Sequence, residues 1–251
     1  MAVMRVNFFA GSLQKAHHMT VLLPQDAEEG GPYPVLYLLH GLSDDDTIWT
    51  RRTSLERYVG GLPLMVVMPD GGRGFYSDAA AGPAWERHIM EDVIGFVERF
   101  FPARADRQGR VIGGLSMGGY GSVKLGLKYP DRFCSVASHS GAFRMSRRVE
   151  EGDRTDEMRR IFGENPAGGA DDPFALAERI DRDRLPAISL DCGTDDFLIE
   201  ENRAFHRHLE RLGVPHRYEE FPGEHEWGYW DRRIRQALRF HTDALGIKPP
   251  D

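Results

Sequence analysis

Apolar residues along this chain gather into short runs, and eight of the runs have the length and composition of β-strands. The predicted strands are residues 4–9, 19–23, 35–39, 64–68, 111–113, 134–139, 187–191 and 216–221. Two of them, 35–39 and 64–68, are almost wholly apolar, which is typical of strands buried on both faces of a sheet. The pattern therefore predicts a sheet that is covered on both sides.

Helical spacing of apolar residues fills most intervals between the later strands. The predicted helices are residues 54–60, 85–100, 116–129, 199–212 and 227–245. Because strand–helix–strand units form right-handed crossovers, this alternation predicts an α/β fold with a mainly parallel eight-stranded sheet and helices on both faces. No helix is predicted between the first two strands, so we expect these two to form an antiparallel edge.

Residues 143–180 interrupt the alternation between two strands. Thr155 precedes a short helical stretch, and Asp172-Pro173 has the form of a helix N-cap and first turn. Since the segment leaves the carboxyl end of a strand, it would rise over the edge of the sheet where ligands of such folds bind. It is either a cap-like insertion that shapes a substrate pocket or a surface excursion without substrate contact.

The chain has 251 residues, of which 41% are hydrophobic and 28% charged. These values are typical of a globular protein, and α/β folds of this length commonly form one domain, so we predict a single domain over residues 1–251. The formal net charge is −7, and acidic residues are interleaved with the arginines. Because nucleic-acid binding requires clustered Lys and Arg, we expect a small-molecule substrate rather than nucleic acid.

Residues 1–11 contain one arginine and no long apolar stretch. This predicts neither a signal peptide nor a membrane span and favours a cytoplasmic protein. Cys134 and Cys192 lie in or beside predicted buried strands, as expected of reduced thiols. The spacing of cysteines and histidines does not resemble a zinc site, and the run Asp44-Asp45-Asp46 is interpreted as a solvated loop. We therefore expect neither a metal nor a cofactor.

Strand 111–113 runs into Gly114-Leu115-Ser116-Met117-Gly118, which has the Gly-x-Ser-x-Gly pattern of a nucleophile elbow. Such a turn raises the serine above the sheet and directs the first N–H groups of the following helix toward a reacting carbonyl. The two glycines leave room where a Cβ would collide with neighbouring backbone. Ser116 is therefore the candidate nucleophile, although a glycine-rich turn can also carry a serine by chance.

A nucleophile of this kind requires an acid and then a histidine on loops that follow later strands. Of the ten histidines, His225 has this order and stands in a loop after the last predicted strand. The loop after strand 187–191 offers both Asp195 and Asp196, and the spacing Gly-x-x-Asp favours Asp196. Asp191 belongs to the strand itself, which places it too deep to reach an imidazole above the sheet.

These motifs resemble those of the esterase D family of α/β-hydrolases, which includes carboxylesterases, feruloyl esterases and S-formylglutathione hydrolases. The resemblance implies an α/β-hydrolase fold with Ser116, Asp196 and His225 as nucleophile, acid and base. It also implies an oxyanion hole formed by the backbone N–H groups of Leu42 and Met117. The similar segments cover nearly the whole chain; those that carry the resemblance are residues 33–41, 68–70, 114–119, 140–142, 193–198 and 223–225.

The glutathione-specific branch of that family has a histidine at the position of Leu115 and a cysteine-containing loop at residues 42–46. This chain has neither feature, so the resemblance favours simple carboxylic esters over S-formylglutathione. We expect a serine esterase that hydrolyses short-chain esters through an acyl-enzyme. The alternatives are S-formylglutathione, feruloyl or acetyl ester hydrolysis, acyl transfer to an alcohol, and a non-catalytic binding protein.

Two aromatic residues stand close to the candidate site in sequence. Trp227 follows His225 by two residues, and Phe143 opens the segment 143–180. If both wall the acyl pocket, they limit its depth to acetyl through butyryl chains, but both could instead be core residues. The sequence leaves the oligomeric state open, a homo-oligomer included.

Overall fold

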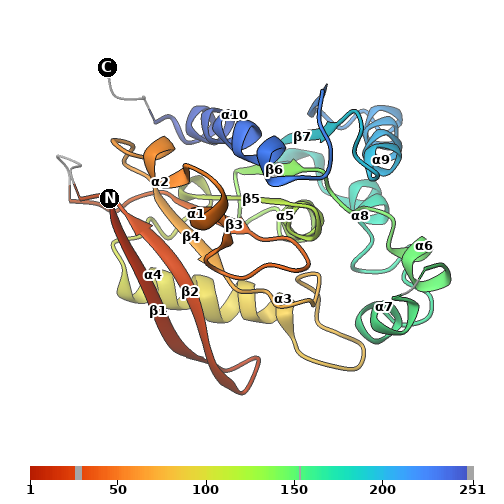
Figure 1. The fold of residues 1–251 in the computed structure, drawn as a ribbon, viewed down its shortest axis with the longest axis horizontal. Helices are drawn as coiled ribbons and strands as arrows, with labels where there is room; N and C mark the ends of the chain where they lie inside the picture. Colours follow the sequence, from red (N-terminus) through yellow and green to blue (C-terminus); the bar gives the residue numbers. More distant parts are fainter. Residues whose placement is uncertain (26–29, 153, 248–251) are drawn as a thin grey trace.

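The computed structural model describes residues 1–25, 30–152 and 154–247. They form one eight-stranded sheet in the order β1-β2-β4-β3-β5-β6-β7-β8 (Figure 1). The strands are β1 (Ala2–Ala10), β2 (Lys15–Leu23), β3 (Val35–Leu39), β4 (Met65–Pro69), β5 (Arg110–Leu115), β6 (Ser135–His139), β7 (Ala187–Gly193) and β8 (Arg217–Phe221). Each predicted strand corresponds to one of these, with boundaries that differ by a few residues.

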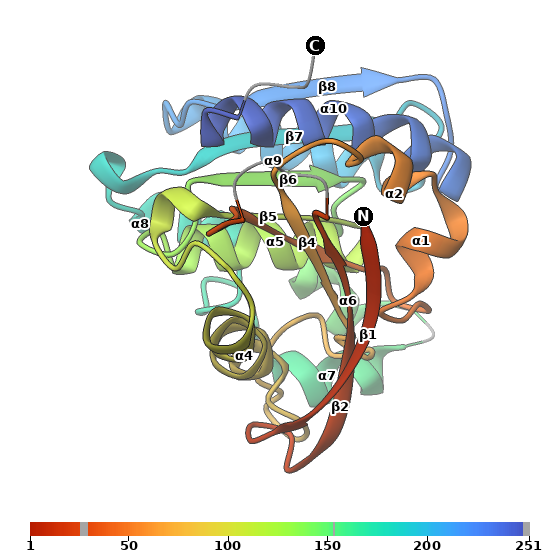
Figure 2. The same cartoon turned by 90° about the vertical axis from the view of Figure 1, so that its left-hand side faces the viewer.

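Six of these strands, β3 to β8, run parallel to one another, whereas β1 pairs antiparallel with β2, and β2 antiparallel with β4. The mainly parallel sheet and its antiparallel edge are therefore confirmed. Figure 2 shows that the strand direction turns strongly across the sheet, from β8 to the steep β1–β2 ribbon. This is the twist that a sheet of L-amino acids adopts.

The buried side chains of β3 alternate between the two faces of the sheet. Val35, Tyr37 and Leu39 belong to the hydrophobic core on one side, and Leu36 and Leu38 to the core on the other. Both faces are covered, which explains why this strand is apolar at every position.

Helices cover the two faces in separate groups, and the prediction of helices on both faces is confirmed. The first core includes side chains of α4 (Ile94–Phe100), α5 (Met117–Lys128), α8 (Pro173–Arg179) and α9 (Ile199–Arg211). The second includes side chains of α1 (Ile48–Arg52), α2 (Leu55–Tyr58) and α10 (Trp227–Leu245). None of the helices in the described parts of the chain is both long and apolar enough to cross a membrane.

Two predicted helices differ in detail from the structure. The prediction over 54–60 corresponds to the shorter α2, and the separate helix α1 before it was not predicted, because five residues are too few to establish a helical period. The prediction over 85–100 corresponds to α3 (Trp85–Arg87), a π-helical stretch His88–Val93 and α4. Its continuity was predicted, but the change of hydrogen-bond pattern within it was not.

The segment 143–180 contains α6 (Met145–Glu150), α7 (Thr155–Phe162) and α8. Asp172 caps α8 as predicted, since its side chain accepts a hydrogen bond from the N–H of Phe174. The Tyr120 hydroxyl donates to the carbonyl of Asp171 at 2.7 Å, which ties this segment to α5. In Figure 1, α6 and α7 lie at the opposite side of the molecule from α2 and the N-terminus.

Candidate active site

Ser116 stands between β5 and α5 in a backbone conformation (φ 53°, ψ −114°) that residues with a side chain rarely adopt. The surrounding glycines permit this turn. A Cβ on Gly118 would lie 2.5 Å from the Leu39 carbonyl oxygen, and one on Gly114 would lie 2.6 Å from the backbone of Gly118. The Gly-x-Ser-x-Gly pattern is therefore dictated here by close approach of backbone to backbone.

His225, in the loop between β8 and α10, brings its imidazole to this serine. Its Nε2 lies 3.0 Å from Ser116 Oγ, and its Nδ1 lies 2.8 Å and 3.0 Å from the two carboxylate oxygens of Asp196. An ionised Asp196 can only accept, so Nδ1–H donates to it and Nε2 accepts the Ser116 hydroxyl proton. The ring is thus oriented as a general base requires.

The choice between the two adjacent aspartates is decided by burial. Asp196 is 2% exposed and also accepts a hydrogen bond from the N–H of Leu198 at 2.8 Å. Asp195 is exposed, and its carboxylate accepts the hydroxyl of Thr194. The structure therefore brings Asp196, and not Asp195, to the histidine.

The charge of Asp196 is stabilised by its neighbours. Burial alone would raise the pKa of this carboxyl, but the hydrogen bond and charge attraction from His225, with the Leu198 N–H, hold its pKa below the ordinary value. Asp196 consequently remains ionised at neutral and mildly acidic pH.

Leu42 and Met117 both line the space above Ser116. Met117 is the first residue of α5, so its N–H belongs to the helix turn that has no intrahelical acceptor. Leu42 belongs to the loop after β3, and this loop lies against the elbow: a Cβ on Gly41 would lie 3.9 Å from the Ser116 Cβ. The two predicted oxyanion donors thus come from segments that meet at the serine.

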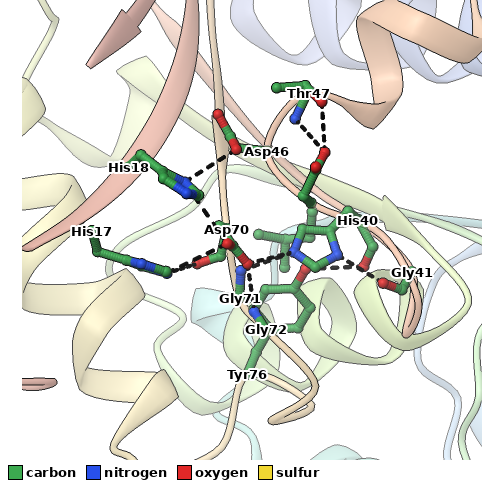
Figure 3. A network of polar contacts seen from close by, with 12 residues as sticks. His17, His18, His40, Gly41, Asp46, Thr47, Asp70, Gly71, Gly72 and Tyr76 are labelled. Atoms are coloured by element: carbon green, nitrogen blue, oxygen red, sulfur yellow. Dashed lines mark hydrogen bonds and ion pairs between the residues drawn. The ribbon is translucent and has the colours of Figure 1, made fainter. Parts of the chain in front are cut away.

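His40, for which the sequence indicated no role, fixes the start of that loop (Figure 3). The N–H of Gly71 donates to His40 Nε2 at 2.8 Å, so the ring carries its proton on Nδ1 and donates it to the Gly41 carbonyl at 2.7 Å. The Tyr76 hydroxyl donates to the His40 carbonyl at 2.9 Å. The loop that carries Leu42 is therefore held from two sides.

Two cavities meet at Ser116. The smaller, about 310 Å³, lies on the side of Met117 and is walled mainly by apolar side chains and by residues of the segment 143–180. The larger, about 620 Å³, lies on the side of His225. Side chains in the smaller cavity include Phe75, Ala142, Arg148, Met158 and Leu198, and those in the larger include Asp44, Arg52, Arg73, Trp227 and Trp230.

The structure places the two predicted pocket aromatics differently. Trp227 is half-buried and lines the larger cavity, where its ring packs edge-to-face on Trp49 at a centroid distance of 5.3 Å. Phe143 is fully buried and packs against Phe205 at 4.6 Å, so it lies in the core beneath the cavities rather than in their walls. Periodicity could not separate these two outcomes, because they depend on packing between distant segments.

Phe197 is a residue that the sequence analysis did not single out. It is 74% exposed, borders both cavities, and its ring centroid lies 4.5 Å from that of His225. The signal available in the sequence was a large apolar side chain directly after Asp196, the candidate acid. Its exposure makes it a candidate contact for substrate.

Asp191 has partners other than the candidate base. It lies in β7 opposite His139 of β6, accepts from His139 Nδ1 at 2.6 Å and from the Tyr229 hydroxyl at 2.8 Å. This carboxylate therefore connects the sheet to α10.

Comparison with known proteins identifies the class of this fold and site. A model of the Esterase family matches residues 10–241. The chain belongs to the Esterase family. The esterase is 30% identical to the acetyl esterase of Caldicellulosiruptor saccharolyticus, over 96% of this chain and 98% of the relative. The resemblance to esterase D enzymes inferred from the motifs is confirmed.

Solved structures agree with this assignment. The esterase is similar to the fluorophosphonate-binding serine hydrolase FphF of Staphylococcus aureus, solved with bound substrate, at 31% identity and a TM-score of 0.88, covering 96% of this chain and 98% of that one. It is also similar to the S-formylglutathione hydrolase FrmB of Staphylococcus aureus, at 31% identity and a TM-score of 0.86 over the same shares. The esterase is thus a serine hydrolase with the α/β-hydrolase fold that acts on carboxylic esters.

Proposed function

We propose that the esterase hydrolyses esters of short carboxylic acids through an acyl-enzyme on Ser116. The observation that carries this proposal is the continuous chain Asp196–His225–Ser116, with bonds of 2.8 and 3.0 Å, at the point where two cavities meet. A hydroxyl with a base on one side and space for two substituents on the other is what acyl transfer requires.

In the first step the Ser116 oxygen attacks the ester carbonyl while His225 Nε2 takes the hydroxyl proton. Asp196 stabilises the imidazolium that forms, and the N–H groups of Leu42 and Met117 donate hydrogen bonds to the negative charge that develops on the carbonyl oxygen. Each such donor contributes about 3 kcal/mol in comparable sites. His225 then gives its proton to the leaving alcohol, and the acyl group remains bound to Ser116. A water molecule, deprotonated by His225, attacks this acyl group. The acid leaves as Ser116 regains its proton from His225.

The position of His225 assigns the two cavities. The leaving oxygen must lie near Nε2 to receive the proton, so the alcohol occupies the larger cavity beside His225 and Trp227. The acyl chain then occupies the smaller cavity toward Met117 and Met158. On this assignment the segment 143–180 acts as a cap over the acyl group, because Met158 belongs to it.

The names of two similar proteins support a small acyl group in the substrate. One relative is named an acetyl esterase and another an S-formylglutathione hydrolase, and both names specify an acyl group with little or no chain. The glutathione-specific features that this chain lacks favour simple esters over the glutathione thioester. Feruloyl esters and transfer of the acyl group to an alcohol are the competing activities.

The proposal is tested by measuring kcat/KM for p-nitrophenyl esters from acetate to decanoate, with S-formylglutathione and methyl ferulate as alternatives. We expect the highest values between acetate and butyrate and a fall at longer chains. An optimum at decanoate would overturn the short-chain assignment, and a preference for S-formylglutathione or ferulate would replace it. Product analysis with added alcohol separates hydrolysis from acyl transfer.

A further inference from the structure

A second cluster of potential ligands lies at the antiparallel edge of the sheet (Figure 3). His17 and His18 are consecutive residues of β2, and Asp70 directly follows β4. The register of these strands pairs Met19 with Pro69, so the next residues, His18 and Asp70, lie opposite each other. Figure 3 shows both imidazoles directed toward Asp70, whose carbonyl oxygen also lies 3.2 Å from His17 Nε2.

The donor atoms are close enough for one ion. His17 Nε2 and His18 Nδ1 each lie 3.7 Å from Asp70 Oδ2, and the three atoms lie within 4.8 Å of one another. Ligands at about 2.1 Å around a tetrahedral ion are about 3.4 Å apart. The two nitrogen–oxygen separations exceed this spacing by about 0.3 Å and the nitrogen–nitrogen separation by at most about 1.4 Å. Binding an ion therefore requires the imidazoles to move closer together as well as toward the carboxylate.

A fourth potential ligand atom, an oxygen of Asp46, lies beside these three. Asp46 Oδ1 lies 3.1 Å from His18 Nδ1, and the Asp46 side chain is fully buried. Nevertheless His18 Nδ1 is a buried atom for which the described residues provide no well-oriented hydrogen bond. A nitrogen that faces two carboxylates without a directed partner is suited to accept a cation between them.

The carboxylates are held in place from behind. Asp70 Oδ1 accepts the N–H of Gly72 at 2.7 Å, while its Oδ2 faces the histidines. Asp46 Oδ2 accepts the hydroxyl of Thr20 at 2.8 Å, while its Oδ1 faces His18. Metal ligands are typically oriented by such hydrogen bonds to the carboxylate oxygen that does not coordinate the ion.

We propose that His17 Nε2, His18 Nδ1 and Asp70 Oδ2 bind a divalent transition-metal ion of the zinc type, with Asp46 Oδ1 beside the fourth position. Two imidazoles and a carboxylate suit zinc and its neighbours, whereas magnesium and calcium prefer oxygen ligands. The paired carboxylates are balanced in part by Arg5, which lies 3.4 Å from Asp46 Oδ1, and a divalent ion would complete that balance. The interpretation of the run 44–46 as solvated is wrong for Asp46, whose side chain is buried and lies at this site.

The site would support the structure rather than perform the hydrolysis. Asp70 Oδ1 lies 3.4 Å from His40 Nε2, and His40 holds the Gly41 carbonyl. A metal ion at Asp70 would therefore fasten β2 and β4 to the loop that carries Leu42. We expect its main effect to be on thermal stability, through ligand binding to the folded state.

Zinc binding to the chelator-treated full chain tests the proposal, by calorimetry and by the shift in Tm. We expect one zinc ion per chain, a raised Tm, and at least about 100-fold weaker binding in His18→Asn. Asp70→Asn, which keeps the side-chain volume, should weaken binding similarly. The Tm of each metal-free variant shows whether it is folded.

The matched control is His206→Asn, because His206 Nδ1 and His216 Nε2 lie 2.8 Å apart at another site and could bind zinc as a pair. This variant should retain the wild-type affinity and stoichiometry. Loss of binding in His206→Asn but not in His18→Asn, or the absence of zinc binding by the wild type, would overturn the proposal. Because the readout is binding, the result is independent of the esterase substrate.

Discussion

At the scale of single residues, the strained conformation of Ser116 makes a clean test of its role possible. Alanine has the same Cβ and meets the same backbone restriction, so Ser116→Ala removes the hydroxyl without changing the turn. We expect the variant to lose at least about 10⁴-fold in kcat and to keep the wild-type Tm. Turnover of more than a few per cent of wild type would exclude Ser116 as the nucleophile.

The two neighbouring aspartates provide a matched pair. Asp196→Asn should lower kcat by about 10⁴-fold, because the amide no longer selects the tautomer in which His225 Nε2 accepts a proton. Asp195→Asn should change kcat less than about threefold, since its carboxylate is exposed and contacts Thr194. Steady-state kinetics of both variants decide the question, and the opposite ranking would assign the acid to Asp195.

At the scale of elements, the cavity assignment separates α7 from the start of α10. Met158→Ala in α7 should move the acyl-chain optimum toward longer acids, because it deepens the smaller cavity. Each additional methylene that fits should add up to about 0.8 kcal/mol to binding. Trp227→Ala should leave that optimum unchanged and alter the preference among alcohols. Measuring kcat/KM for esters that vary in the acid and, separately, in the alcohol tests both effects. If Met158→Ala changed the alcohol preference and Trp227→Ala the acyl optimum, the assignment of the two cavities would be reversed.

The units of strand, glycine-containing turn and helix could be predicted from the sequence. The period of hydrophobic residues and the residue types of a turn depend only on residues that are close together in the chain. Ser116, Asp196 and His225 were located in this way, because each follows a strand that ends at the same edge. The cavity walls could be predicted only in part: Trp227 lines a cavity as expected, whereas Phe143 does not. Whether Phe143 faces substrate or Phe205 depends on segments far apart in sequence, and so does the contact of Phe197 with His225.

At the scale of the whole molecule, His241 of α10 makes the fold sensitive to acid. Complete burial, together with the charge of the nearby His139, lowers the pKa of His241 to about 3, and Ser135 contacts its Nδ1 at 2.9 Å. In the unfolded chain the ordinary pKa is about 6.5. The unfolded state therefore binds a proton that the folded state rejects, and stability falls as the pH drops from about 6.5 toward 3.

His241→Gln tests this coupling, because glutamine can still contact Ser135 but does not titrate. Between pH 7 and pH 5 the wild type should lose about 2 kcal/mol of unfolding free energy through this group, and the variant should lack that part of the loss. Urea unfolding at both pH values measures it. Equal pH slopes for the two proteins would mean that His241 titrates normally in the fold.

The edge position of β8 has a further consequence, because the strand that precedes His225 has a neighbour on one side only, β7, and none of its residues is fully buried. Ser116, by contrast, follows β5 at the centre of the sheet. Local opening concentrates at weakly packed edges, so the base should leave the serine before the sheet itself melts. On heating, hydrolysis should cease several degrees below the loss of circular dichroism, and cooling before that second transition should restore it.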